Sequence, residues 1–303
     1  MKSKLADILY ITGMVLSWAT YYAVSKWAVD YTSSAYLAGF LLRISAFVFL
    51  TVYIFIKREQ KNLFRYGKTT FLFLLIGLLG YLLDVFANLG FRASSVSTGT
   101  VLLKTDVLMA NIASAILFKE KLFASDWFGS VIMLIGVILV LNIDYADFAF
   151  NWYDIFFLLS ALSVTVNAFV IKAVQQKKNA DSDTIAYYNN FTVMVLFLVS
   201  ALVADDFGIL GGIETDFKFF ALLIAGGLAQ SLIYIFYYRN LKRFPVWKVK
   251  LFLLFIPIVS CFVGVFAFGE EIVALQYAGI ALVLSGAAVI LMRKKLKELL
   301  NRR

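Results

Sequence analysis

The chain has 303 residues, of which 62% are hydrophobic and 16% are charged, with a formal net charge of +9 and a mean hydropathy of +0.86. A soluble domain is nearer half apolar and about a quarter charged, so the composition excludes an ordinary soluble protein and indicates a polytopic membrane protein. The lack of histidine and the single cysteine, Cys261, exclude a histidine-based triad and an intramolecular disulfide.

Ten apolar stretches are long enough to cross the roughly 30 Å hydrocarbon core of a bilayer as helices. The first follows Lys2 and Lys4, but it is too long for the core of a signal peptide and lacks a small-residue cleavage site, so we expect it to stay in the protein as a helix. The sequence therefore predicts an all-α integral membrane fold. The stretches fall at about residues 8–29, 34–56, 69–91, 96–118, 125–143, 153–174, 184–204, 217–239, 246–268 and 274–292.

The distribution of the basic residues indicates how the chain is oriented in the membrane. Ten spans place both termini and four loops on one side of the membrane, and these segments with the adjoining helix ends hold all but five of the 28 Lys and Arg residues. The positive-inside rule therefore predicts a multi-pass protein of the cell inner (plasma) membrane with both termini cytoplasmic, and it explains the net charge without nucleic-acid binding. The five exceptions are Lys26, Arg92 and Lys218 on the opposite side and Arg43 and Lys104 within spans.

One stretch of the chain occurs twice, 150 positions apart, because residues 118–140 align without a gap on residues 268–290. Half the chain length separates the copies, which predicts two five-helix repeats, at 1–147 and 148–303. Since five is odd, the second repeat enters the membrane from the opposite side, so the repeats are inverted. Glycines seven positions apart lie on nearly one helix face, where they let another backbone approach. The matched pairs are Phe118 and Phe268, Glu120 and Glu270, Trp127 and Tyr277, Gly129 and Gly279, and Gly136 and Gly286.

Four charged residues interrupt the centres of the second, third and fourth spans: Arg43, Asp84, Lys104 and Asp106. At a rise of 1.5 Å per residue, all four lie about 18–22 Å from the cytoplasmic face, near the bilayer midplane. Each charge costs several kcal/mol there unless it is paired or hydrated, so we expect the four to converge on one another or on a water-filled cavity. They form either an ion-pair cluster that holds the three spans together or a substrate and coupling site, which we favour.

The positions of the two carboxylates predict different roles for them. Asp84 shares a face of the third span with Tyr81 and Asn88, which makes it the better candidate for a cavity residue. Lys104 and Asp106 are two positions apart, about 200° around a helix, so they cannot both face one partner. We expect Asp106 to be the structural partner of a buried cation, either Lys104 or Arg43.

The second half of the chain supplies neutral polar groups and, by this interpretation, no midplane charge. Gln230 is one of them, and Trp18 and Tyr22 in the first span offer aromatic walls at comparable depth. Pro257 in the ninth span is expected to open a helix turn toward a cavity. The candidate substrate-binding or coupling residues are therefore Arg43, Asp84, Asn88, Lys104, Asp106, Trp18, Tyr22 and Gln230. We find no catalytic arrangement or phosphate-binding loop, and we expect no enzyme activity, no cofactor and no metal site.

These features resemble the drug/metabolite transporter superfamily, specifically its EamA-type members with two five-helix repeats. The segments FKEKLFASDWFG and FGEEIVALQYAG are similar to the family's turn and glycine-bearing last helix of each repeat. The segment WATYYAVSK and Arg43 are similar to the first two helices. Pro257 matches the family's proline near the start of the fourth helix of a repeat, whereas the first repeat has LKTDVL instead. The resemblance covers the whole chain and implies a ten-helix carrier of small metabolites, often an exporter.

We therefore predict a secondary transporter, an exporter of a small polar or zwitterionic metabolite that works by alternating access. A lipid or lipid-linked-sugar flippase is one alternative, which the aromatic content of 17% would suit. A non-transporting membrane partner protein is the other, and the lack of a soluble domain counts against it. The expected partners are a small-molecule substrate, the lipid bilayer and a possible coupling ion, proton or sodium, in a monomer or homodimer.

Overall fold

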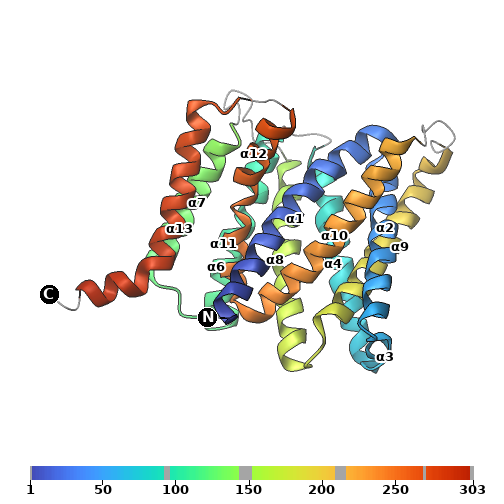
Figure 1. Cartoon of the computed structure of the whole chain (residues 1–303), viewed down its shortest axis with the longest axis horizontal. Coiled ribbons are helices and arrows are strands. Elements are labelled where there is room, and N and C mark those ends of the chain that lie inside the picture. The colour runs from blue at the N-terminus through green and yellow to red at the C-terminus, as the bar shows by residue number, and fades with distance from the viewer. Residues whose placement is uncertain (1, 92–95, 143–151, 209–215, 269–270, 301–303) are drawn as a thin grey trace. The chain divides into compact units, whose positions relative to one another are not determined.

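The computed structural model describes the chain except residues 1, 92–95, 143–151, 209–215, 269–270 and 301–303. Within the described residues every regular element is a helix, so the predicted all-α fold is confirmed (Figure 1). The α-helices are α1 (Lys2–Thr32), α2 (Ala35–Ile56), α3 (Gln60–Leu63), α4 (Thr70–Phe91), α5 (Val96–Leu103), α6 (Thr105–Leu117), α7 (Ala124–Val140), α8 (Asp154–Lys177), α9 (Ser182–Val203), α10 (Phe217–Arg243), α11 (Val246–Leu253), α12 (Ile256–Phe268) and α13 (Ala274–Leu300), with a short 3-10 helix at Gly67–Thr69.

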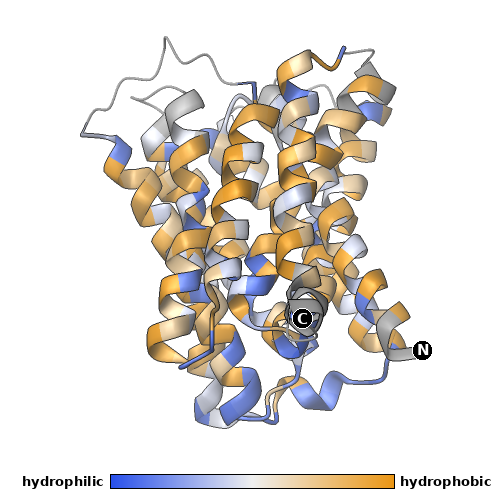
Figure 2. Cartoon of the chain, turned by 90° about the vertical axis from the view of Figure 1, so that its left-hand side faces the viewer, coloured by the Kyte–Doolittle hydropathy of each residue, from blue (hydrophilic) through white to orange (hydrophobic). Residues whose placement is uncertain are grey.

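Six segments of the described chain are long and apolar enough to cross a membrane as unbroken helices. Hydrophobic residues predominate along the helices, whereas hydrophilic residues gather at helix ends and connections (Figure 2). Large apolar side chains on the helix surfaces, such as Val48 and Phe128, are exposed, as expected for residues that face lipid. The chain is therefore a multi-pass membrane protein. The six segments are Leu5–Val29, Ala35–Ile56, Gly67–Gly90, Asp154–Lys177, Ser182–Val203 and Phe217–Arg243, and two shorter apolar helices are Ala124–Val140 and Ala274–Ile290.

The predicted fourth and ninth spans are each divided into two helices, α5 with α6 and α11 with α12. The breaks fall at Lys104 and at Leu254, 150 positions apart, and at each one a backbone N–H bonds to the carbonyl three residues back, at 3.0 and 3.1 Å. In the ninth span, Pro257 lacks the N–H that would continue the helix. In the fourth span, the Thr105 hydroxyl donates to the Leu102 carbonyl at 2.6 Å, the acceptor that Asp106 would use in a continuous helix.

The described helices pack into two compact units, each of which draws on both halves of the chain. Unit 1 comprises Met1–Asn88 and Val166–Phe244, and unit 2 comprises Leu89–Thr165 and Pro245–Arg303. The predicted domains at 1–147 and 148–303 follow the sequence repeat and not this packing, and they stay a prediction.

In unit 1, α2 packs antiparallel on α9, its counterpart in the second half. Gly39 near the start of α2 lies against Phe197 late in α9, whereas Phe47 further along α2 stacks near Tyr187 early in α9, at 5.0 Å between ring centroids. α10 also approaches α2 closely, because Gly227 leaves room for Ser45. Antiparallel packing of corresponding helices is the arrangement that inverted repeats produce.

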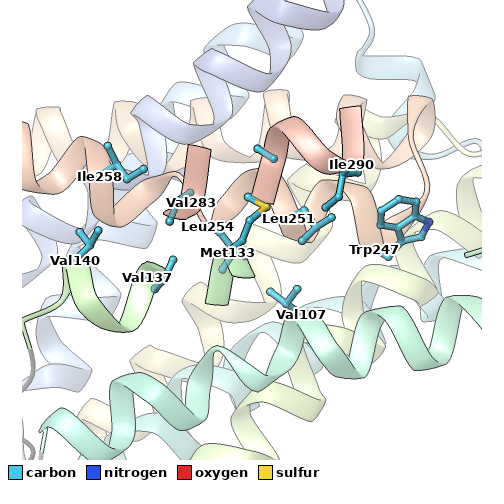
Figure 3. Close-up of a cluster of buried hydrophobic side chains, with 11 residues drawn as sticks. Val107, Met133, Val137, Val140, Trp247, Leu251, Leu254, Ile258, Val283 and Ile290 are labelled. Carbon is cyan, nitrogen blue, oxygen red and sulfur yellow. The ribbon is translucent and has the colours of Figure 1, made fainter. Parts of the chain in front are cut away.

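In unit 2, α7 and α13, the last helices of the two repeats, pack antiparallel through their matched glycines. A Cβ atom on Gly136 would lie 2.7 Å from the carbonyl oxygen of Gly279, so the predicted role of these glycines in close backbone packing is confirmed. An apolar cluster in the same unit joins these helices to α6, α11 and α12 (Figure 3). Its buried members are Val107, Met133, Val137, Val140, Trp247, Leu251, Leu254, Ile258, Val283, Ala287 and Ile290.

Candidate substrate-binding residues

Arg43 and Asp84 meet within unit 1, as the sequence analysis anticipated for charges at one depth. Arg43 lies on the buried face of α2 and is only 7% exposed. Its guanidinium donates to the hydroxyl of Tyr234 on α10 at 2.5 Å and to Asp84 Oδ2 on α4 at 3.4 Å. The rings of Tyr21 and Tyr234 each lie with their centroids 5.8 Å from the guanidinium carbon. The cation is therefore held by one carboxylate and by aromatic rings.

The Arg43–Asp84 pair is loose and unevenly exposed. The Asp84 side chain keeps 32% of its surface exposed, against 9% for the Arg43 side chain. The contact at 3.4 Å is longer than the 2.7–2.9 Å typical of a charge-assisted hydrogen bond. The Nε atom of Arg43 is buried and has no hydrogen-bond partner. Arg43 thus retains donor capacity that Asp84 does not use.

Buried amide side chains from α9 and α10 extend this polar region. Asn190 donates to the backbone carbonyl of Arg43 at 3.0 Å, and Asn189 donates to the hydroxyl of Tyr238. Gln230, which is 4% exposed, lies one turn before Tyr234 on α10. Since the carbonyl oxygens of Asn189 and Asn190 have no hydrogen-bond donor, the region has spare acceptors as well as a spare donor.

The remaining candidates of unit 1 are distributed around this region. Trp18 on α1 contacts the ring of Tyr237 edge-on, with centroids 5.1 Å apart. Asn88 is half-buried one turn after Asp84 on α4, and Tyr22 on α1 is 47% exposed. Thus Asp84 contacts Arg43 directly, and Gln230 lies one helical turn from Tyr234, the tyrosine that accepts from Arg43. Trp18 is connected to Tyr234 through the rings of Tyr237 and Tyr238.

Asp106 pairs with Lys250 in unit 2. The Lys250 ammonium lies 2.9 Å from Asp106 Oδ2, and the two side chains are 1% and 14% exposed. From the sequence we expected Lys250 to be one of the cytoplasmic basic residues, Lys104 or Arg43 to be the partner of Asp106, and the second half of the chain to carry no deep charge. These three expectations were wrong, because α11 packs against α6 and buries a lysine that lies five residues into its own helix. A basic residue inside an apolar span was the signal that could have revealed it.

Lys104 is half-buried at the junction between α5 and α6. It is attracted by Asp106 and repelled by Lys250. Among the described residues it makes neither a hydrogen bond nor an ion pair. The structure therefore separates the four predicted charges into an Arg43–Asp84 pair in unit 1 and a Lys104, Asp106 and Lys250 group in unit 2.

A second ionic network, which the sequence analysis did not identify, joins the ends of α2, α9 and α10 in unit 1. Asp183, whose side chain is 4% exposed, lies 2.7 Å from the Lys57 ammonium and 3.0 Å from the Arg239 guanidinium. Burial alone would lower the pKa of Lys57, but hydrogen bonds with Asp183 and Glu59 outweigh it and raise that pKa. The carboxylates of Glu59, Asp181 and Asp183 are close enough to hold a cation, yet Lys57 and Arg239 already neutralise Asp183.

Comparison with known proteins shows which class of protein this chain belongs to. The model of the EamA-like transporter family matches residues 5–142 and again residues 151–292. A protein of Archaeoglobus fulgidus described as an uncharacterized transporter is 24% identical over 283 residues, which cover 92% of this chain and 96% of that protein. A solved crystal structure of a protein with 16% identity has a TM-score of 0.76 and covers 96% of this chain and 98% of that chain, which shows a shared fold.

A helical membrane protein whose two halves both match a transporter model is a membrane transporter of the drug/metabolite type and not an enzyme. Because the matches cover most of the chain, the protein belongs to the EamA-like transporter family. The resemblance inferred from its repeated segments is thereby confirmed.

Proposed function

We propose that the protein is a secondary transporter that exports a small polar or zwitterionic metabolite by alternating access. The observation that carries this proposal is the Arg43–Asp84 pair, a cation and an anion within one polar region of apolar helices. A zwitterion presents a carboxylate and an ammonium, which are complementary to such a pair. Neutral hydrogen-bonding groups beside the pair, such as Gln230, would orient the rest of the molecule.

The looseness of the pair supports substrate binding over a purely structural role. Arg43 has an unused Nε donor, and a guanidinium can bind a carboxylate through two parallel hydrogen bonds. Asp84 is partly exposed and would accept an ammonium group, while the face of Tyr21 or Tyr234 adds a cation–π contact. A substrate can therefore replace the weak contact between Arg43 and Asp84 with two stronger ones.

The inverted repeats support alternating access. Corresponding helices pack antiparallel within each unit, α2 on α9 and α7 on α13. When two similar halves have opposite orientations, a protein can adopt two related conformations that face opposite sides of the membrane. The direction, export, rests on the family resemblance.

A lipid flippase remains the alternative carrier. Such a protein needs an apolar path for acyl chains, whereas Arg43 and Asp84 would impose a desolvation cost of several kcal/mol on apolar cargo. We therefore favour the zwitterion.

Metabolite profiling tests the proposal. We expect medium from cells that contain the protein to accumulate at least one zwitterionic or polar metabolite several-fold over medium from cells without it. Arg43→Gln should abolish this accumulation, whereas Lys218→Gln, the loss of an exposed lysine at the start of α10, should preserve it. Identical media would contradict transport of a small metabolite, and accumulation that is independent of Arg43 would contradict the site.

The proposed location is the plasma membrane with both termini in the cytoplasm. Single cysteines in a Cys261→Ala background test this orientation. Asp206→Cys should react with an impermeant thiol reagent applied to intact cells, and Lys178→Cys, at the exposed end of α8, should react only after the cells are opened. Labelling of position 178 in intact cells would overturn the orientation.

A further inference from the structure

The helices of the fourth and ninth spans in unit 2 carry more positive than negative charge. Their described residues, with the junction residue Lys104, include the cations Lys104, Lys248 and Lys250 and the anion Asp106. Lys248 lies in the first turn of α11, at the end of the span. Lys104 and Lys250 are thus two ammonium groups on helices that carry one carboxylate, Asp106.

The carboxylate is not shared equally. Lys250 is 1% exposed and holds Asp106 at 2.9 Å, which is the geometry of a strong charge-assisted hydrogen bond. Lys104 has no hydrogen bond or ion pair within the described chain, and it is repelled by Lys250. An unpaired cation within a membrane span is unfavourable, and proteins keep such groups mainly where they act on a substrate or an ion.

Two helix ends meet at the break beside Lys104. α6 begins at Thr105, immediately after Lys104, and no side chain caps its first turn. α5 ends at Leu103, so the positive start of α6 lies next to the negative end of α5, and the two helix ends offset each other. The charges that act on the Lys104 ammonium are therefore the Lys250 ammonium, which repels it, and the Asp106 carboxylate, which is already paired with Lys250. An incoming anion would complete this charge balance.

We propose that Lys104 binds an anionic group, a carboxylate or a phosphate, of the transported metabolite. This inference rests on the proposed transport function and narrows it, because the substrate must then carry an acidic group that pairs with Lys104. Because Asp106 is already paired with Lys250, its carboxylate does not neutralise Lys104.

The first test uses the stability of the purified protein without substrate. Lys104→Met removes an unpaired cation and keeps an unbranched side chain of similar size, so the melting temperature should rise by a few degrees. Lys250→Met removes the partner of Asp106, and the melting temperature should fall. If Lys104→Met lowers the melting temperature as Lys250→Met does, Lys104 is a structural partner and the proposal is overturned.

The second test measures which compounds the protein releases. Proteoliposomes are loaded with a water-soluble metabolite extract of the expression host, and the compounds released by the protein are identified by mass spectrometry. We expect release of a carboxylate- or phosphate-bearing metabolite, a loss of at least tenfold with Lys104→Gln, and recovery with Lys104→Arg. Lys218→Gln should match the parent.

The identity of the released compound distinguishes a carboxylate from a phosphate. Release only of metabolites that lack a carboxylate or phosphate group would leave the transport function intact and overturn the role of Lys104, and so would unchanged release by Lys104→Gln. Release of no compound by the parent would instead overturn transport of small metabolites, and this inference with it.

Discussion

Gly129 of α7 and Gly286 of α13 contact each other reciprocally through their backbones. A Cβ atom on Gly129 would lie 2.9 Å from the carbonyl oxygen of Gly286, and one on Gly286 would lie 2.7 Å from the carbonyl oxygen of Gly129. Gly136 and Gly279 have the same relationship. The sequence repeat matches Gly129 with Gly279 and Gly136 with Gly286. Gly129 therefore contacts the counterpart of Gly136, and Gly136 contacts the counterpart of Gly129. This reciprocity is the pattern of a two-fold interface, formed here within one chain.

We expect any side chain at these glycines to separate α7 from α13. The obstacles are backbone carbonyl oxygens of the facing helix together with side-chain atoms, such as Ile290 Cγ1 at 2.5 Å from a Cβ on Gly129. Because the backbone atoms cannot rotate away, Gly129→Ala and Gly286→Ala should each cost about 1–3 kcal/mol. Leucine at either position should sharply reduce the yield of folded protein. Size-exclusion profiles and melting temperatures in detergent measure both effects.

Gly208 provides the matched control, because a Cβ atom there would meet nothing within 4 Å. Gly208→Ala should therefore behave like the parent. A Gly129→Leu protein that folds normally and changes only its substrate preference would contradict the packing role.

Sequence patterns were sufficient to predict the helical membrane fold. Hydropathy depends only on residues close in sequence, and the repeat is visible as an exact spacing along the chain. The same patterns did not reveal the helix break at Lys104. The apolar run continues across it, and the break depends on the Thr105 hydroxyl bonding to Leu102 and not on a proline.

Ion pairing was harder to predict than charge burial. The sequence indicated that Arg43, Asp84, Lys104 and Asp106 are deep in the spans, and two of them, Arg43 and Asp84, do pair. The partner of Asp106 is Lys250, 144 positions away, and that pair exists because α11 packs on α6. Packing between helices of the two repeats decides which helices are neighbours, and a single sequence does not show this packing.

The Asp106–Lys250 pair should stabilise unit 2 asymmetrically. Asp106→Asn leaves Lys250 buried next to Lys104 without a carboxylate, so we expect a loss of about 3–5 kcal/mol. Lys250→Met should cost less, because Lys104 remains within electrostatic range of Asp106. Thermal unfolding of the single variants and of the Asp106→Asn, Lys250→Met double variant would measure the coupling between them. Equal losses in both single variants would show that Lys104 does not interact with Asp106.

The Lys57–Asp183 contact should stabilise the folded protein, and this stabilisation should be lost only in strong alkali. Since the folded state raises the pKa of Lys57, this contribution is complete below the unfolded value of about 10.4 and is lost as the pH rises through the higher folded value. Lys57 is 33% exposed, so solvent limits the effect to about 0.5–1 kcal/mol. Melting temperatures of Lys57→Met should fall below those of the parent equally at about pH 7 and pH 9 and less at about pH 11. Lys61→Met, at an exposed position of α3, should show no such pattern.

Asp84 is the carboxylate that we expect to handle a coupling proton. Such a group must be reachable by water and must not be held by a strong partner. Asp84 is 32% exposed and lies 3.4 Å from Arg43, whereas Asp106 is 14% exposed and lies 2.9 Å from Lys250. With no histidine in the chain, buried carboxylates are the remaining candidates for this role.

Asp84→Asn should therefore fold but fail to use a pH gradient. Arg43 keeps its hydrogen bond to Tyr234 at 2.5 Å, so the loss of Asp84 does not leave the guanidinium without a partner. In proteoliposomes supplied with the exported metabolite, the variant should lose accumulation driven by an imposed pH gradient. It should keep exchange of substrate at equal pH, at a higher substrate concentration than the parent needs, because exchange requires binding through Arg43 but no net proton movement. Asp106→Asn should instead reduce the amount of folded protein. If Asp84→Asn accumulates substrate like the parent, protons are not handled at Asp84, and sodium coupling or facilitated diffusion becomes the better mechanism.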